Sequence, residues 1–322
     1  MVAFMTNTLE GEPVTENPHI RPEPHVSDFN VPVVEEFRAN GGRVGGMFEG
    51  GDLLLLTTVG ARSGREHTTP LGFVRVDGRV LVVGSAGGSD RHPDWYRNVL
   101  AHPMVNVELG TETFGAVAVP AEGAERDRLF AEFVRADSGY ADYQAGTERV
   151  LPVVALERVH EDGPTEAANL ADKLVEIHTW LRGQLAHVRT EAESHLAERT
   201  AGAEGDGPPP LGLSLQLRQH CLAFCESLHF HHSSEEFGMF PALEQQAPHL
   251  EEALRRLAEE HRTVDRLRGE LEALISDLTT ADPERFRAEL DRMTRELEAH
   301  LDYEESQLIP TLAAIPFPPA AS

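Results

Sequence analysis

Lysine, cysteine and long apolar runs are nearly absent from this sequence, and each shortage excludes a class of protein. Its 322 residues include 54 Asp and Glu against 28 Lys and Arg, of which Lys173 alone is lysine. The formal charge of −26 repels phosphate backbones and anionic lipid headgroups. We therefore expect neither a nucleic-acid partner nor a membrane-surface role.

No apolar stretch approaches the roughly 20 residues of a membrane span, and no basic segment followed by an apolar one opens the chain. The two cysteines, Cys221 and Cys225, lie four residues apart with no partner elsewhere, which excludes a disulfide framework. These features predict a cytoplasmic, soluble protein without an integral membrane segment. Its length exceeds that of one ordinary core and predicts two domains.

The pattern of the first half predicts short strands separated by glycine. Asp77-Gly78 is a strong hairpin signal, and two short helices are expected near residues 94–101 and 124–136. Strand-like stretches occur at 52–60, 67–76, 79–87, 104–110, 113–120 and 149–159. Many short strands with few helices predict a small barrel or a sandwich, not a parallel doubly wound sheet.

The second half is helical, because the hydrophobic period changes from 2 to 3.6 after residues 160–167. Four amphipathic segments follow, at about 168–199, 213–239, 249–278 and 283–309, and predict an up-down four-helix bundle. The predicted organisation is a proline-rich flexible arm (1–27), a strand-rich domain (28–160), a linker (161–169), the bundle (170–312) and a tail (313–322).

Each predicted helix carries a histidine on its apolar stripe. These are His178, His231, His261 and His300, and two of them have a glutamate four residues later, Glu235 and Glu304. A lone histidine of this kind is ordinarily a hydrogen-bonded core residue. Four together with two inward carboxylates would cost several kcal/mol unless a cation neutralised them. Nitrogen and oxygen donors without thiolate favour iron or manganese.

The register of the second helix is open at this point. His232 with Glu236, in line with His229 and Cys225, forms an alternative inward face. We favour His231 with Glu235, since their spacing to the following proline matches that of His300 and Glu304. Four further bundle histidines are taken as surface or supporting residues: His187, His195, His220 and His249.

Two strings carry a family resemblance. "HHSSEEFGMFP" (231–241) and "HLDYEESQLIP" (300–310) resemble the paired motifs of the hemerythrin-like cation-binding family, and the resemblance spans about 168–312. It implies an iron centre, expected to be di-iron, bound by His178, His231, Glu235, His261, His300 and Glu304. Oxygen-carrying members have two histidines four apart on the third helix, but Leu257 and Asp265 flank His261 here. We therefore expect binding, sensing or turnover of oxygen, peroxide or nitric oxide.

The strand-rich half has no Gly-x-Gly-x-x-Gly fingerprint and no obvious Ser/His/Asp set, which argues against ordinary dinucleotide binding. Two glycine-rich loops stand out. "VGARSGREHTTP" (59–70) offers backbone amides and two arginines that could hold a phosphate, although such a turn is often merely solvated. "GSAGGSDRHPDWYRNV" (84–99) enters a helix, where amides again suit an anion.

Together these strings, with "SGYADYQAGTERVLPVVALE" (138–157), closely resemble the deazaflavin-dependent nitroreductase and quinone reductase family over about 29–158. The resemblance implies a split β-barrel of the flavin-reductase type that binds reduced coenzyme F-420, a deazaflavin with a phosphate and an oligoglutamate tail. It assigns the phosphate and tail to Arg62, Ser63, Gly64 and Arg65. It assigns the deazaflavin to Ser85, Ala86, Gly87, Gly88, Trp95 and Tyr96.

The same resemblance places Tyr140 and Tyr143 beside the substrate, with Tyr140 orienting or protonating the acceptor oxygen as hydride arrives. Asp137 and Gly146 stand where relatives carry further aromatic residues, which predicts a wider and more polar acceptor pocket.

The sequence as a whole predicts a two-domain α+β oxidoreductase. Its barrel would transfer hydride from reduced F-420 to a quinone or nitro-type acceptor, and its bundle would hold non-haem iron. The alternative is an iron-binding sensor or store whose first domain binds a deazaflavin or FMN without turnover. No oligomeric state is predicted.

Overall fold

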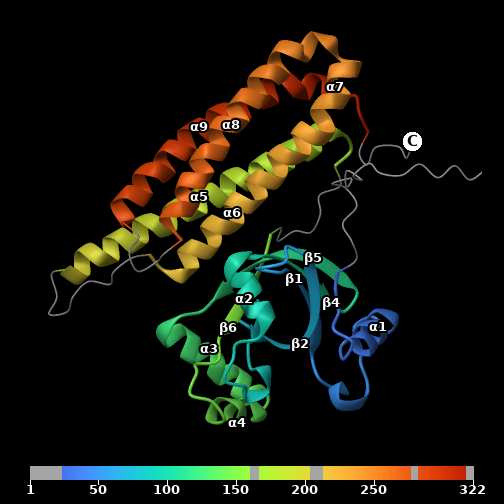
Figure 1. Ribbon diagram of the computed structural model, residues 1–322, viewed down its shortest axis with the longest axis vertical. Helices are drawn as coiled ribbons and strands as arrows, with labels where there is room; N and C mark the ends of the chain where they lie inside the picture. The colour runs from blue at the N-terminus through green and yellow to red at the C-terminus, as the bar shows by residue number, and fades with distance from the viewer. Residues whose placement is uncertain (1–23, 160–166, 204–212, 277–281, 317–322) are drawn as a thin grey trace, which may run out of the picture.

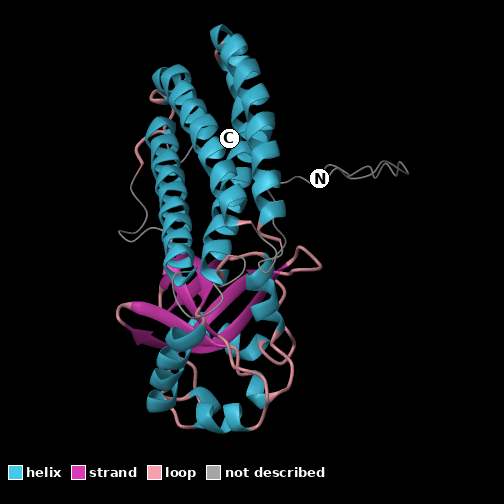
Figure 2. Ribbon diagram, turned by 90° about the vertical axis from the view of Figure 1, so that its left-hand side faces the viewer, coloured by secondary structure: helices cyan, strands magenta, loops and turns pink. Residues whose placement is uncertain are grey.

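The computed structural model describes residues 24–159, 167–203, 213–276 and 282–316, which form a strand-rich domain followed by a helical one (Figures 1 and 2). This order confirms the predicted two-domain α+β architecture. Within the described residues, no helix is both long and apolar enough to cross a membrane.

The first domain is a closed antiparallel barrel with strand order β1-β2-β3-β6-β5-β4. Its strands are β1 (Leu53–Val59), β2 (Glu66–Val76), β3 (Arg79–Val83), β4 (Met104–Leu109), β5 (Glu112–Pro120) and β6 (Val153–Arg158). The β2–β3 turn places Asp77 at φ 51° and Gly78 at φ 79°, the left-handed pair that a tight hairpin requires. Closure selects the barrel over the sandwich that the sequence left open.

Short helices surround the barrel. They are α1 (Val31–Ala39), the 3₁₀ turns η1 (Gly46–Phe48) and η2 (Ala86–Gly88), α2 (Asp94–Ala101), α3 (Gly123–Ala136) and α4 (Gly139–Ala145). The sequence predicts α2 and α3 but misses α1 and α4, which are too short to show clear periodicity. Figure 1 shows α3 and α4 at the end of the barrel that points away from the helical domain.

The second domain is built on four long helices. Its elements are α5 (Leu170–Ala203), α6 (Leu215–Ser234), the π-helical turn η3 (Glu235–Met239), α7 (Phe240–Gln246), the 3₁₀ turn η4 (Pro248–Leu250), α8 (Glu251–Leu274) and α9 (Pro283–Leu312). Helix α5 packs against α6 and α9, and α8 packs against the same two helices. Asp282 begins α9 by accepting hydrogen bonds from the amides of Glu284 and Arg285, as a good N-cap does. The predicted bundle is confirmed.

The predicted arm and linker fall mostly outside the described residues. The end of the arm is ordered, because the His25 amide donates to Glu66 O (2.7 Å) and the Thr68 amide donates to His25 O (3.0 Å). At the other end, Asn169 pairs with Pro316 in an isolated bridge, which ties the start of the bundle to the predicted tail.

The two domains are docked through α6, which lies across β5. Gln219 is fully buried there, and its Nε2 donates to the carbonyl oxygens of Val99 (2.7 Å) and Ala118 (3.3 Å) in the barrel domain. Arg218 donates to Leu100 O (2.6 Å). Because a buried amide left without these partners would cost about 1–3 kcal/mol, the contacts fix how α6 sits on the barrel.

A buried histidine links three elements at this interface. The Nδ1 atom of His220 lies 2.7 Å from Glu191 Oε2 on α5, and its Nε2 atom lies 3.0 Å from Glu157 Oε2 on β6. Burial alone would lower the pKa of His220, but the hydrogen bonds to Glu157 and Glu191 outweigh it and raise that pKa to about 9. The sequence left His220 as either a surface or a supporting residue. At 2% exposure it is a buried supporting residue.

We predict that this imidazolium stabilises domain docking at neutral pH. Its folded-state pKa exceeds the unfolded value, so the contribution is complete below pH 6.5 and is lost as pH rises through about 9. A shift of this size corresponds to about 3–4 kcal/mol. Denaturant unfolding should show His220→Gln destabilised by that amount at pH 6.5 and nearly level with the wild type at pH 10.

The matched control is His249→Gln, since His249 is exposed on η4. It should follow the wild type at both pH values. A destabilisation of His220→Gln that does not change between pH 6.5 and pH 10 would contradict the charged bridge.

Candidate functional site

The first predicted cofactor loop is a tight, exposed turn between β1 and β2. The Gly64 amide donates to Gly60 O (2.8 Å), and Gly64 adopts φ 64°, a conformation that glycine allows. The Arg65 amide donates to Ser63 Oγ (3.3 Å), while the side chains of Arg62 and Arg65 are exposed. Two guanidinium groups on a backbone turn suit a phosphate or a chain of carboxylates.

Helix α2 connects this turn to the second predicted loop. Asn98 of α2 accepts a hydrogen bond from the Ala61 amide (3.0 Å) and donates to Thr58 Oγ1 (3.0 Å). The second loop runs directly into α2, so one short helix positions both loops.

The second loop has an unusual backbone that one arginine holds. Ala86, Gly87 and Gly88 adopt φ values of 47°, 60° and 80° in succession. The guanidinium group of Arg149 donates to three carbonyl oxygens around them, those of Gly84 (2.9 Å), Ser85 (2.6 Å) and Ser89 (2.7 Å). Sequence reasoning missed Arg149, because nothing in the linear pattern connects it to a loop about 60 residues earlier.

The two predicted substrate tyrosines stand on α4 beside this loop. Their rings meet edge to face, with centroids 6.0 Å apart. A Cβ atom on Gly88 would lie 3.4 Å from Tyr143 O, and one on Gly72 would lie 3.1 Å from the Tyr140 hydroxyl oxygen. The structure therefore brings Ser85–Gly88, Tyr140 and Tyr143 together at the end of the barrel that carries α4.

Burial determines how the aromatic residues behave. It raises the pKa of Tyr140, with Asp137 as a second cause, so the phenol keeps its proton at neutral pH. Tyr143 is more exposed, at 41%. Trp95 is 5% exposed within the barrel core, where its indole packs with Leu54, Val82 and Val154, and Tyr96 packs partly buried against that core.

The second candidate site lies inside the bundle, where histidines from four helices converge. Three of them have Nδ1 held by a glutamate: His178 by Glu305 (2.8 Å), His261 by Glu236 (3.0 Å) and His300 by Glu260 (3.1 Å). A carboxylate on Nδ1 favours the tautomer whose proton sits there, which turns the Nε2 lone pair inward. Metal-binding histidines are typically held in this way.

Two carboxylates lie between these imidazoles. Glu235 has one oxygen 3.3 Å from His231 Nε2 and the other 3.4 Å from His261 Nε2. Glu304 Oε2 lies 3.4 Å from His178 Nε2 and 3.7 Å from His300 Nε2. Each carboxylate therefore lies between two histidines that belong to different pairs. The first pair is His178 with His231, and the second pair is His261 with His300.

These histidines, together with Glu235 and Glu304, form a cluster in which little positive charge balances the two carboxyl groups. All four oxygens of Glu235 and Glu304 are buried, and within the described part of the chain none has a hydrogen-bond partner. Burial lowers the pKa of His231 and of His261 to about 3, so both imidazoles are neutral. Burial also raises the pKa of Glu235, with Glu304 as a further cause. A bound cation removes this conflict and suits this set of donors, so the residues fit an iron centre.

The spacing of the first pair supports the same conclusion. His178 Nε2 and His231 Nε2 are 3.0 Å apart. Two imidazole nitrogens bound side by side to one metal ion at about 2.1 Å also lie about 3 Å apart. Two apolar cores pack within the same bundle, one that includes Phe224 and Leu297 and another that includes Leu257 and Leu308.

Helix α6 turns both of its candidate histidines, His231 and His232, toward the interior. His231 and His232 are both buried, at 5% and 6% exposure, so the two faces that the sequence set against each other both point inward. Glu235 lies among the inward imidazoles, whereas Glu236 holds His261 from outside. The π-helical turn that begins at Glu235 accompanies this arrangement, and such turns are frequent at functional sites.

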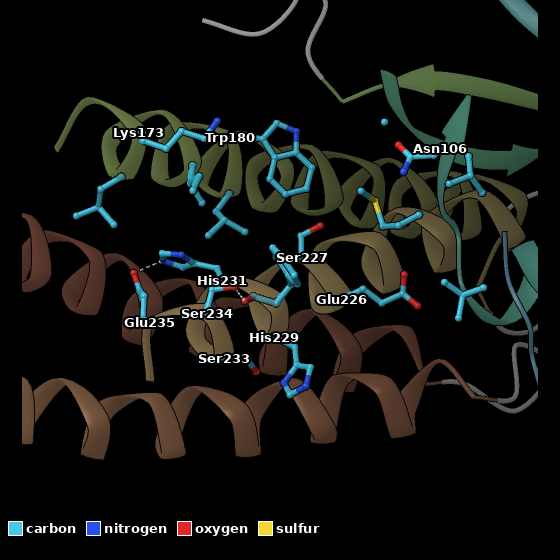
Figure 3. Close-up of a pocket in the computed structure, with 18 of the residues that line it drawn as sticks. Asn106, Lys173, Trp180, Glu226, Ser227, His229, His231, Ser233, Ser234 and Glu235 are labelled. Carbon is cyan, nitrogen blue, oxygen red and sulfur yellow. Dashed lines mark hydrogen bonds and ion pairs between the residues drawn. The ribbon is translucent and has the colours of Figure 1, made fainter. Parts of the chain in front are cut away.

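A cavity of about 850 Å³ lies between the bundle and the barrel and reaches the cluster (Figure 3). Its lining includes Thr57 and Asn106 from the barrel, Trp180 from α5, and the cluster residues His231 and Glu235. Most of the lining surface is apolar, although Lys173, Glu226 and Glu235 also form part of the wall.

Comparison with known proteins divides the chain at the same place. Residues 32–158 match the family model described as F420H(2)-dependent quinone reductase, and residues 169–312 match the Hemerythrin HHE cation binding domain. Two Mycobacterium tuberculosis proteins named F420H(2)-dependent quinone reductase, from strains H37Rv and CDC 1551, are each 37% identical over 127 residues, 38% of this chain and 85% of theirs. A solved F420-H2 dependent reductase, FDR-A, is 39% identical over 33% of this chain and 94% of that chain, with a TM-score of 0.31.

We predict that removing metal destabilises the bundle, because Glu235 and Glu304 are then left inside without a counter-charge. A cation present at 100 times its dissociation constant contributes about 2.7 kcal/mol. Chelation should therefore lower the melting temperature by about 10 °C in circular dichroism. The variant His231→Ala, which weakens the site, should respond little to chelator. Equal melting temperatures for iron-loaded and chelated wild-type protein would contradict the prediction.

Proposed function

The chain belongs to the F420H(2)-dependent quinone reductase family, and we propose that its barrel transfers hydride from reduced F-420 to a quinone. A nitro compound is the second acceptor class that we propose. The observation that carries the proposal is the left-handed loop of Ala86–Gly88, held by Arg149 beside two tyrosines. Bound F-420 would supply the hydride, and the protein supplies binding and orientation.

The roles of the barrel residues follow from their positions. Arg62 and Arg65 are exposed cations on a glycine turn, and we assign them, with Ser63 and Gly64, to the phosphate and acidic tail. In a protein of charge −26, such a local basic turn provides attraction that the remaining surface does not. Ser85 to Gly88 and Tyr96 are assigned to the deazaflavin. Trp95 supports them from the core.

Tyr140 is proposed to hold the acceptor oxygen. Its hydroxyl lies near β2 and keeps its proton, because burial raises its pKa. A phenol in this position can donate a hydrogen bond to a quinone oxygen and pass its proton as the oxygen gains charge. Tyr143, more exposed on the same helix, is proposed to pack against the acceptor ring.

In the bundle we propose a centre of two iron ions that share Glu235 and Glu304. The observation that carries this proposal is that each carboxylate lies between one histidine of the first pair and one of the second. His178 and His231 would hold one ion, and His261 and His300 the other. Iron in such a site would supply electrons and coordination positions for a small oxidant.

The cavity at the domain interface suggests what reaches this iron. Its lining is mainly apolar, and His231 and Glu235 form part of its wall. Apolar surroundings favour uncharged molecules, so we propose oxygen, nitric oxide or peroxide as the ligand that is bound, sensed or turned over.

Turnover tests the barrel proposal. Purified protein supplied with reduced F-420 and menadione should oxidise the deazaflavin. Tyr140→Phe should lower kcat at least about 10-fold with a smaller change in KM, because the proton donor is lost. Tyr303→Phe in the bundle is the matched control and should leave the rate unchanged. An inactive wild type would contradict quinone reduction, and full activity in Tyr140→Phe would contradict the tyrosine's role.

Metal analysis tests the bundle proposal. Protein reconstituted anaerobically with ferrous iron and then desalted should hold two irons per chain. Glu304→Ala, which removes one shared ligand, should lower this content to one or less. Retention of two irons by Glu304→Ala would show that the carboxylate is not shared between the ions.

A further inference from the structure

His232 is a buried imidazole that the six-residue ligand set leaves without a role. It is 6% exposed, and within the described part of the chain its Nε2 atom is buried with no hydrogen-bond partner. An unpaired buried polar group is costly and rare, so its retention calls for a ligand.

The surroundings of His232 indicate what that ligand is. Its ring stacks on His261, with centroids 4.0 Å apart and planes within 11°, and it meets His300 edge to face at 5.1 Å. One nitrogen from each of the three imidazoles lies within 4.8 Å of the others. The Nε2 atoms of His261 and His300 are also buried and, among the described residues, without hydrogen-bond partners. Each of these three neighbouring imidazoles therefore has a buried Nε2 atom available to a cation.

Consecutive residues of α6 reach opposite sides of the cluster because that helix packs between two others. His231 faces α5, where its Nε2 lies 3.0 Å from that of His178. His232 faces α8, where it stacks on His261. Successive side chains on an α-helix diverge by about 100°, which suits one helix that serves two separate ions.

We propose that His232 is a third imidazole ligand of the cation held by His261 and His300. This inference rests on the proposed two-cation centre. It gives the two cations different numbers of imidazole ligands. One cation has three imidazoles, whereas the other has only His178 and His231. The cavity wall includes His231 but none of the three histidines of the second group.

The test uses the full-length protein, freed of metal and titrated with cobalt(II), whose visible absorption reports coordination. Wild type should bind two equivalents. His232→Ala should bind one as the wild type does and the second at least about 100-fold more weakly. The matched control is His229→Ala, one turn earlier on α6 and exposed, which should bind both equivalents normally. Normal binding of both equivalents by His232→Ala would overturn the inference.

A stability measurement separates ligation from packing. As a ligand, His232 contributes more when metal is bound, so His232→Ala should lower the melting temperature of the loaded protein clearly more than that of the metal-free protein. Equal losses in both states would assign His232 to packing and overturn the inference.

The two proposals fail in different ways. A wild type that binds one cobalt contradicts the two-cation centre, and His232 keeps its role as a ligand only if His232→Ala weakens that single site. A wild type that binds no cobalt overturns both.

Discussion

The helical half depends on one constraint, the burial of two carboxyl groups among imidazoles from four helices. Glu235 and Glu304 are 4% and 0% exposed, and burial lowers the pKa of two neighbouring imidazoles, those of His231 and His261, to about 3. Because burial raises the pKa of Glu235, this carboxyl group can lose its proton at neutral pH only with a cation beside it. The surrounding glutamates on the Nδ1 atoms then act as second-layer acceptors that orient each ring. Four helices, two apolar cores and a π-helical turn position these side chains.

The barrel and the bundle use different means to build a site. The bundle turns side chains inward from rigid helices, whereas the barrel offers backbone loops fixed by a few polar residues. Arg149 and Asn98 hold those loops through hydrogen bonds to carbonyl and amide groups. Helix α4, with both tyrosines, lies at the end of the barrel away from the bundle (Figure 1). The two proposed activities therefore do not share a substrate pocket, and any influence of one on the other passes through the barrel and α6.

The sequence predicted most of the architecture because local patterns carry it. Hydrophobic period separated strands from helices, and the histidine stripe followed from a 3.6-residue period, which identifies an inward face without knowledge of the neighbouring helix. The same rule forced a choice between His231 and His232. It could not show that α6 lies between two partners and buries both, because that depends on tertiary packing.

Long-range contacts account for the remaining differences. Arg149 reaches a loop some 60 residues away, and His220 joins Glu157 of the barrel to Glu191 of the bundle. Neither pairing leaves a signal in the linear sequence. Trp95, by contrast, was visible as part of a motif, but only the barrel core shows that its indole is used for packing.

Anomalous diffraction at the iron absorption edge from crystals of the reconstituted protein tests the central claim most directly. We expect two peaks within the bundle, one at coordination distance from the Nε2 atoms of His178 and His231 and the other at coordination distance from those of His261 and His300. A well-ordered bundle without an anomalous peak among these residues would contradict it.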